Sequence, residues 1–90
     1  MPAVTIHVHV VNRLGMHARP AMMFVDVAAE FASSVRVKRD DLDVDGKSIM
    51  EVMMLAAGQG SELTIVVEGA DADAAAAKLK ALVEGGFDEE

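Results

Sequence analysis

A histidine and an arginine stand two residues apart in residues 15–21, whose sequence reads Gly-Met-His-Ala-Arg-Pro-Ala. Pro20 lacks a backbone N–H donor and fits only the first turn of a helix. The helix therefore begins at or beside His17, where unpaired N–H groups and the positive end of the helix dipole attract anions. A phosphate on the imidazole would meet those N–H groups, and Arg19 could add a charge-assisted hydrogen bond. The pattern indicates a phosphohistidine site, against the plainer alternative of a surface histidine beside a solvated arginine.

Length and composition limit the class of protein. Ninety residues predict a single domain over residues 1–90. The lack of cysteine excludes a disulfide framework and thiolate chemistry. No leader and no apolar run long enough to span a bilayer is recognisable, so we expect a cytoplasmic protein without direct membrane insertion.

The formal net charge is −7, and it is unevenly spread. Six of the eight basic residues lie in residues 1–60 against seven acids, so the acidic excess falls in residues 61–90. The acidic balance argues against nucleic acid as a partner. Three phenylalanines without tyrosine or tryptophan also offer no platform on which bases could stack. An anion-handling surface therefore belongs in the first part, which holds His17.

The spacing of apolar residues predicts the element order β-α-β-β-α-β-α. Strands are expected at residues 4–10, 35–38, 42–44 and 63–67. Helices are expected from the His17 segment to about residue 31, at 49–56, and from Asp71 or Asp73 to a stop at 85–86. Helices interleaved with a few alternating strands indicate a two-layer α+β domain, with helices on one sheet face and water on the other.

The segment Ser48-Ile49-Met50-Glu51 has the pattern of a capping box. In that motif the serine hydroxyl accepts from the third helical N–H, and the glutamate reaches back to the N–H of the serine. We therefore expect Ser48 to start the second helix.

His7 and His9 lie on the same face of the first predicted strand, and a His-x-His pair can chelate a metal. No third ligand stands near them in sequence. We therefore expect no metal and no cofactor, and interpret both histidines as polar residues on the open face of the sheet.

The methionines are expected both to fill the core and to form an adaptable surface. We expect Met53 or Met54 in the core and Met50 outside. The acidic residues 88–90 are expected to be a solvated end.

Residues 12–21 closely resemble the active-site segment of HPr, the histidine-containing phosphocarrier of the phosphoenolpyruvate-dependent sugar phosphotransferase system. Residues 47–50 resemble that family's regulatory-serine segment. The resemblance covers nearly the whole chain and implies an open-faced β-sandwich of order β-α-β-β-α-β-α, with a four-stranded antiparallel sheet and three helices on one face.

The resemblance also implies a relay of phosphate. Enzyme I takes phosphate from phosphoenolpyruvate and gives it to HPr, which passes it to enzyme II A domains. Here the phosphate would sit on Nδ1 of His17, and Arg19 would contact it. The chain would then be a phosphoryl-transfer intermediate rather than an independent catalyst, and we expect it to be a monomer. Gly15 would let a partner's backbone approach closely.

Two further roles follow from the resemblance. Ser48 matches the serine that an HPr serine kinase/phosphorylase modifies in some bacteria. The positions implied to dock partners are apolar, namely Ile49, Met50 and Met53.

Three positions depart from the family pattern. Asp26 and Ala29 lie on the outer face of the first helix, where many HPr proteins carry lysine, arginine or a neutral polar residue. Glu51 places a negative charge one turn from Ser48 and opposes a second one there. Independently of these positions, an alternative is a regulatory HPr-like module, of the nitrogen-type phosphotransferase branch or under kinase control, that acts mainly through protein binding.

Overall fold

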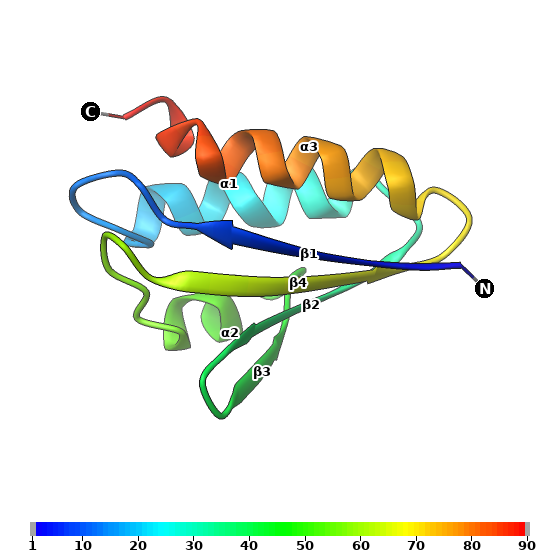
Figure 1. The fold of residues 1–90 in the computed structure, drawn as a ribbon, viewed down its shortest axis with the longest axis horizontal. Coiled ribbons are helices and arrows are strands. Elements are labelled where there is room, and N and C mark those ends of the chain that lie inside the picture. Colours follow the sequence, from blue (N-terminus) through cyan, green and yellow to red (C-terminus); the bar gives the residue numbers. More distant parts are fainter. Residues whose placement is uncertain (1, 90) are drawn as a thin grey trace.

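A four-stranded antiparallel sheet backed by helices carries the segment that contains His17 (Figure 1). The computed structural model describes residues 2–89. The strands are β1 (Ala3–His9), β2 (Ser34–Arg39), β3 (Leu42–Asp45) and β4 (Glu62–Glu68). The helices are α1 (Ala18–Ala29), α2 (Ile49–Met54), α3 (Ala72–Glu84) and a final 3-10 turn, η1 (Gly86–Asp88).

The sheet has the order β1-β4-β2-β3, so the chain's first and fourth strands are neighbours. Val8 stands opposite Leu63 in the β1–β4 pair, and Val37 stands opposite Ile65 in the β2–β4 pair. All four side chains are fully buried, because alternate residues of each strand face the helices. The predicted alternation is thus confirmed, and it fixes the register of the sheet.

The helices pack on one face of this sheet. α3 lies against β1 and β4, α1 lies beside α3, and α2 bridges α1 and β3. The predicted two-layer α+β arrangement with three helices is confirmed. Figure 1 places α1 and α3 side by side above the sheet, with the C-terminal turn close to the start of α1.

One predicted detail of the helices is wrong. Neither Met53 nor Met54 enters the core, since their exposed fractions are 44% and 62%. Val52 and Leu55, three residues apart and therefore on one side of the turn, are fully buried instead. α1 and α2 also end two residues before the predicted ends, a difference within the usual fraying of helix ends.

A carboxylate joins the end of α1 to the start of α3. Asp71, the N-cap of α3, accepts hydrogen bonds from the N–H of Ala32 at 2.8 Å and the N–H of Ser33 at 2.9 Å. The Ser33 hydroxyl also donates to it. The Ser33 hydroxyl, followed by the Ala32 N–H, lowers the pKa of the Asp71 carboxyl. This junction holds α1 and α3 side by side, and so keeps the start of α1 near the C-terminal turn.

Candidate functional site

The N-terminus of α1 lies where the proline predicts it. His17 is the N-cap residue, in an extended conformation with φ −78° and ψ −171°, and Pro20 is the third helical residue. The carbonyl of His17 accepts the first helical hydrogen bond, from Ala21 N–H at 3.0 Å. The prediction that the helix begins beside His17 is confirmed.

Two backbone donors remain open at this helix end. Pro20 has no N–H, and among the described residues no acceptor is bonded to the N–H of Ala18 or Arg19. His17 makes no side-chain cap to them. The first turn therefore offers two N–H groups and the helix dipole to an anion bound next to the imidazole.

The loop before His17 is held against the segment that follows α2. Met16 N–H donates to the carbonyl of Ala57 at 2.8 Å, and Met16 is buried. Gly15 has φ +68°, and a Cβ there would lie 2.4 Å from the same carbonyl oxygen. The positive φ and the close Ala57 carbonyl therefore favour glycine at position 15, because a side chain there would meet the chain's own backbone.

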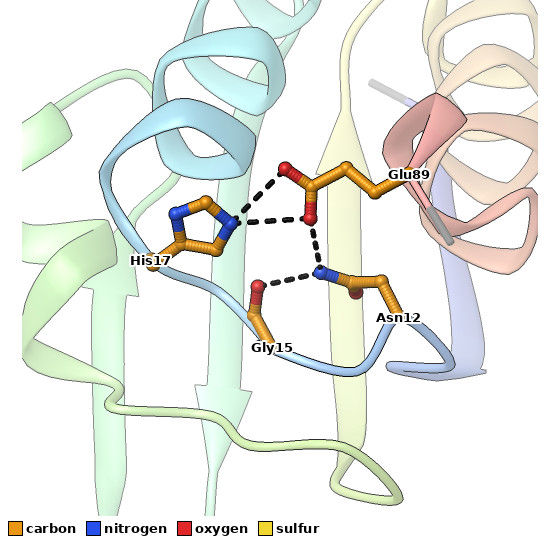
Figure 2. Close-up of polar contacts among 4 residues, drawn as sticks. All are labelled: Asn12, Gly15, His17 and Glu89. Carbon is orange, nitrogen blue, oxygen red and sulfur yellow. Dashed lines mark hydrogen bonds and ion pairs between the residues drawn. The ribbon is translucent and has the colours of Figure 1, made fainter.

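The C-terminal segment returns to His17, so the predicted solvated end is wrong for Glu89. His17 Nε2 lies 3.1 Å from Oε1 and 3.0 Å from Oε2 of Glu89 (Figure 2). Asn12 Nδ2 donates to Glu89 Oε1 at 3.0 Å and to the Gly15 carbonyl at 2.7 Å. The Glu89 side chain is only 18% exposed, against 37% for His17. Glu90 lies outside the described residues.

The environment keeps Glu89 ionised. The hydrogen bond with His17 is the largest of the causes that lower the pKa of the Glu89 carboxyl. The Asn12 amide and the positive charge of Arg19 act in the same direction, and partial burial opposes them. An anionic carboxylate therefore stands beside the imidazole at neutral pH.

Phe87 explains why the tail turns back. α3 ends at Gly85, and Gly86 follows with φ +72°. Phe87 is 1% exposed and has φ +55°, a backbone conformation that its burial must stabilise. Glu89 N–H then donates to the Gly86 carbonyl at 2.9 Å. A lone aromatic residue after two glycines, in an otherwise acidic tail, is the sequence signal that could have predicted the return of the tail toward the core.

Arg19 is exposed at the start of α1. Within residues 2–89 its guanidinium makes no hydrogen bond or ion pair, but its charge acts on Glu89. The structure thus brings His17, Asn12 and Glu89 into contact and places Arg19 within electrostatic reach of them. Asp26 and Ala29 are exposed on α1, as predicted.

At the start of α2 only half of the predicted capping box forms. The Ser48 hydroxyl accepts from the Glu51 N–H at 3.3 Å, so Ser48 is the N-cap. The Glu51 carboxylate does not return to Ser48 and instead accepts from the Asp45 N–H at 3.0 Å. The Ser48 N–H is already donated to the Asp45 carbonyl at 3.1 Å, which removes the need for the second arm.

The positions implied to dock partners differ in exposure. Met50 is 78% exposed and Met53 44%, whereas Ile49 is half-buried against the core. Large exposed apolar side chains also occur in the loop before α1, on α1 and at the end of α2, at Val11, Leu14, Met22 and Met54. Such exposed apolar surface is typical of an interaction site.

The open face of the sheet carries the other histidines. His7 Nδ1 lies 3.1 Å from the Thr64 hydroxyl, and His9 Nε2 lies 3.6 Å from Glu62. Within the described part of the chain, no three His, Cys, Asp or Glu side chains gather as a metal site would require. No helix among those described is long and apolar enough to cross a membrane.

The fold and the histidine segment define a phosphocarrier domain, because residues 4–85 match the family described as the PTS HPr component phosphorylation site. The chain is 49% identical over 83 residues to the phosphocarrier protein HPr of Treponema pallidum, covering 92% of this chain and 94% of that protein. It is 49% identical over 90 residues to that of Pseudomonas aeruginosa, covering 99% and 98%. The crystal structure of HPr from Bacillus anthracis superposes with a TM-score of 0.87 at 41% identity, over 92% of this chain and 99% of that one.

The chain belongs to the HPr family of phosphocarriers of the phosphotransferase system. The sheet and helices expected from the resemblance are those of the family's solved structures.

Proposed function

We propose that the chain accepts a phosphoryl group on Nδ1 of His17 from phospho-Enzyme I and passes it to enzyme II A domains during sugar uptake. The phosphoryl group originates from phosphoenolpyruvate. In this proposal the chain works as a monomer in the cytoplasm, and it is an intermediate of transfer rather than an independent enzyme. The observation that carries the proposal is the position of His17 at the N-cap of α1, next to two open backbone N–H groups.

The energetics of this position suit a carrier. A helix terminus stabilises a nearby anion by roughly 0.3–1 kcal/mol, and by up to ~2 kcal/mol in favourable geometry. That is enough to orient a phosphoryl group and too little to trap it. A carrier must release the group to the next protein, so shallow stabilisation serves transfer better than a deep binding site.

The experiment that tests the proposal is incubation with Enzyme I and labelled phosphoenolpyruvate. We expect about one label per chain, labile to acid and stable to base. A chain that takes no label, or takes it as an acid-stable ester, would contradict a phosphohistidine.

Replacing Arg19 by alanine is expected to slow phosphoryl transfer by roughly tenfold or more, with a melting temperature close to the parent. The reason is that hydrogen bonds to charged groups contribute about 1.5–3 kcal/mol. In the folded chain Arg19 is exposed and makes no such bond, so its loss costs little stability. Stopped-flow transfer from phospho-Enzyme I measures the rate.

Arg36→Ala is the matched control, because Arg36 is an exposed arginine on the open face of the sheet, paired with Asp43. Its transfer rate should equal that of the parent. If Arg19→Ala transferred phosphate at the parent rate, Arg19 would be only a surface charge without a part in the transfer.

Ser48 is proposed to be an N-cap first and a target of an HPr serine kinase/phosphorylase second. Ser48→Asp is expected to weaken binding to Enzyme I while changing the free energy of unfolding by no more than ~1 kcal/mol, since aspartate is itself an accepted N-cap. The added charge would lie next to Ile49 and Met50, in apolar surface proposed to dock the partner. Calorimetric titration with Enzyme I measures the affinity.

Ser34→Asp controls for charge alone. Ser34 is the exposed first residue of β2, and it lies on the open face of the sheet because the next residue, Val35, is buried under the helices. Equal affinities of the Ser48 and Ser34 variants for Enzyme I would place Ser48 outside the docking surface and leave capping as its whole role.

A further inference from the structure

We propose that Glu89 is a positioning residue that selects which nitrogen of His17 is phosphorylated. By accepting a hydrogen bond from Nε2–H, its carboxylate leaves Nδ1 as the nitrogen with the free electron pair. This inference rests on the proposed function, because it presupposes phosphorylation of His17.

The contact itself fixes the tautomer. Both oxygens of Glu89 lie within 3.1 Å of His17 Nε2. An ionised carboxylate can only accept hydrogen bonds, and a neutral imidazole carries its proton on one of its two nitrogens. The proton must therefore stand on Nε2. The bond made by one ring nitrogen sets the state of the other, so Nδ1 is unprotonated.

Figure 2 shows the two ring nitrogens on opposite sides of the imidazole, with Nε2 toward Glu89 and Nδ1 toward the start of α1. The open N–H groups of Ala18 and Arg19 belong to that start. The nitrogen left free by Glu89 is thus the one on the side of the anion-binding helix end.

The carboxylate is held in place from its other side. Asn12 is 1% exposed, and its amide nitrogen donates both to Glu89 and to the Gly15 carbonyl. If the amide were turned over, its oxygen would face two acceptors, the Gly15 carbonyl and the Glu89 carboxylate. Only the orientation seen here lets the amide donate a hydrogen bond to both. The lowered pKa of Glu89 agrees with this, because it keeps the carboxyl from becoming a donor at neutral pH.

The electron pair of Nδ1 attacks phosphorus, a P–N bond forms, and the bond from phosphorus to the donor breaks with its electron pair staying on the donor. Nε2 keeps its proton, so the ring gains a positive charge that the carboxylate of Glu89, 3.0 Å away, offsets. On transfer to an acceptor, the P–N bond breaks and its electron pair returns to Nδ1. Phosphorylation at Nε2 would instead require the incoming phosphoryl group to displace the anionic carboxylate of Glu89 from that nitrogen.

The test uses phosphoramidate, a small phosphoryl donor that needs no docking surface. Phosphorus-31 and nitrogen-15 NMR then distinguish the Nδ1 and Nε2 isomers of phosphohistidine. We expect the parent to form the Nδ1 isomer in large excess. In Glu89→Ala this excess should fall by about tenfold, the usual effect of losing a charge-assisted hydrogen bond.

Two variants separate positioning from structure. Glu89→Asp keeps the carboxylate and should restore much of the excess. Glu62→Ala removes the carboxylate next to His9, on the opposite sheet face, and should leave the ratio at the parent value. In the unphosphorylated protein in mildly alkaline solution, nitrogen-15 correlations of His17 should show the Nε2–H tautomer in the parent and a growing Nδ1–H tautomer in Glu89→Ala.

The outcomes separate the two proposals. Labelled His17 with the same isomer ratio and tautomer in Glu89→Ala as in the parent overturns the role of Glu89 alone. Phosphate found on His7 or His9 but not on His17 overturns the proposed function together with this inference.

Discussion

Replacing His17 by alanine is expected to abolish acid-labile phosphorylation by Enzyme I and phosphoenolpyruvate while leaving the fold intact. Of the three histidines, only His17 lies at a helix N-terminus next to an arginine. The other two contact Thr64 and Glu62 on the open face of the sheet. Because the His17 side chain is partly exposed, its truncation leaves no cavity in the core. Label incorporation and thermal unfolding by circular dichroism measure the two halves of this result.

His7→Ala and His9→Ala are the matched controls and should both incorporate label as the parent does. Label that persists in His17→Ala would contradict the assignment. A loss of label in either control variant would move the site to the open face.

The second large effect is expected from Phe87→Ala. Truncation of a buried phenylalanine costs about 3–5 kcal/mol of unfolding free energy, because burial is lost and a cavity remains. For a domain of this size, a loss of that order lowers the melting temperature by more than about 10 °C. Phe87 also anchors the turn that returns Glu89 to His17, so the Nε2 contact should loosen as well. Urea unfolding measures the first effect, and the His17 tautomer measures the second.

Phe31→Ala supplies a comparison within the same chain. Phe31 is only half-buried beyond the end of α1, so its truncation should cost clearly less and leave the His17 tautomer unchanged. A Phe87→Ala protein whose unfolding free energy lies within about 1 kcal/mol of the parent would show that the tail is not anchored by its aromatic ring.

The local features of the site could be predicted from the sequence because they depend on neighbours. Pro20 fits only the first turn of a helix, so the helix must begin shortly before it. His17 is indeed the N-cap. The alternation of Leu63, Ile65 and Val67 places all three inside, as predicted. Periodicity and backbone restrictions act over a few residues, so a single sequence contains them.

The environment of His17 could not be predicted in the same way. Glu89 stands 72 residues from His17, and it belongs to an acidic tail of the kind that is usually solvated. Its position follows from the positive φ of Phe87 and the burial of that ring, which are set by tertiary packing. The same holds for Glu51. Its carboxylate accepts from the Asp45 N–H because the Ser48 N–H already donates to the Asp45 carbonyl in the turn before α2.

The most direct test of the central claim is a pulse and chase of the phosphoryl group. The chain is labelled by Enzyme I and phosphoenolpyruvate, separated from both, and mixed with an enzyme II A domain. We expect the label to leave the chain and to arrive on the A domain one for one, with Arg19→Ala giving the same end point more slowly. Label that stays on the chain, or that leaves it only as inorganic phosphate, would contradict a phosphocarrier that acts through His17.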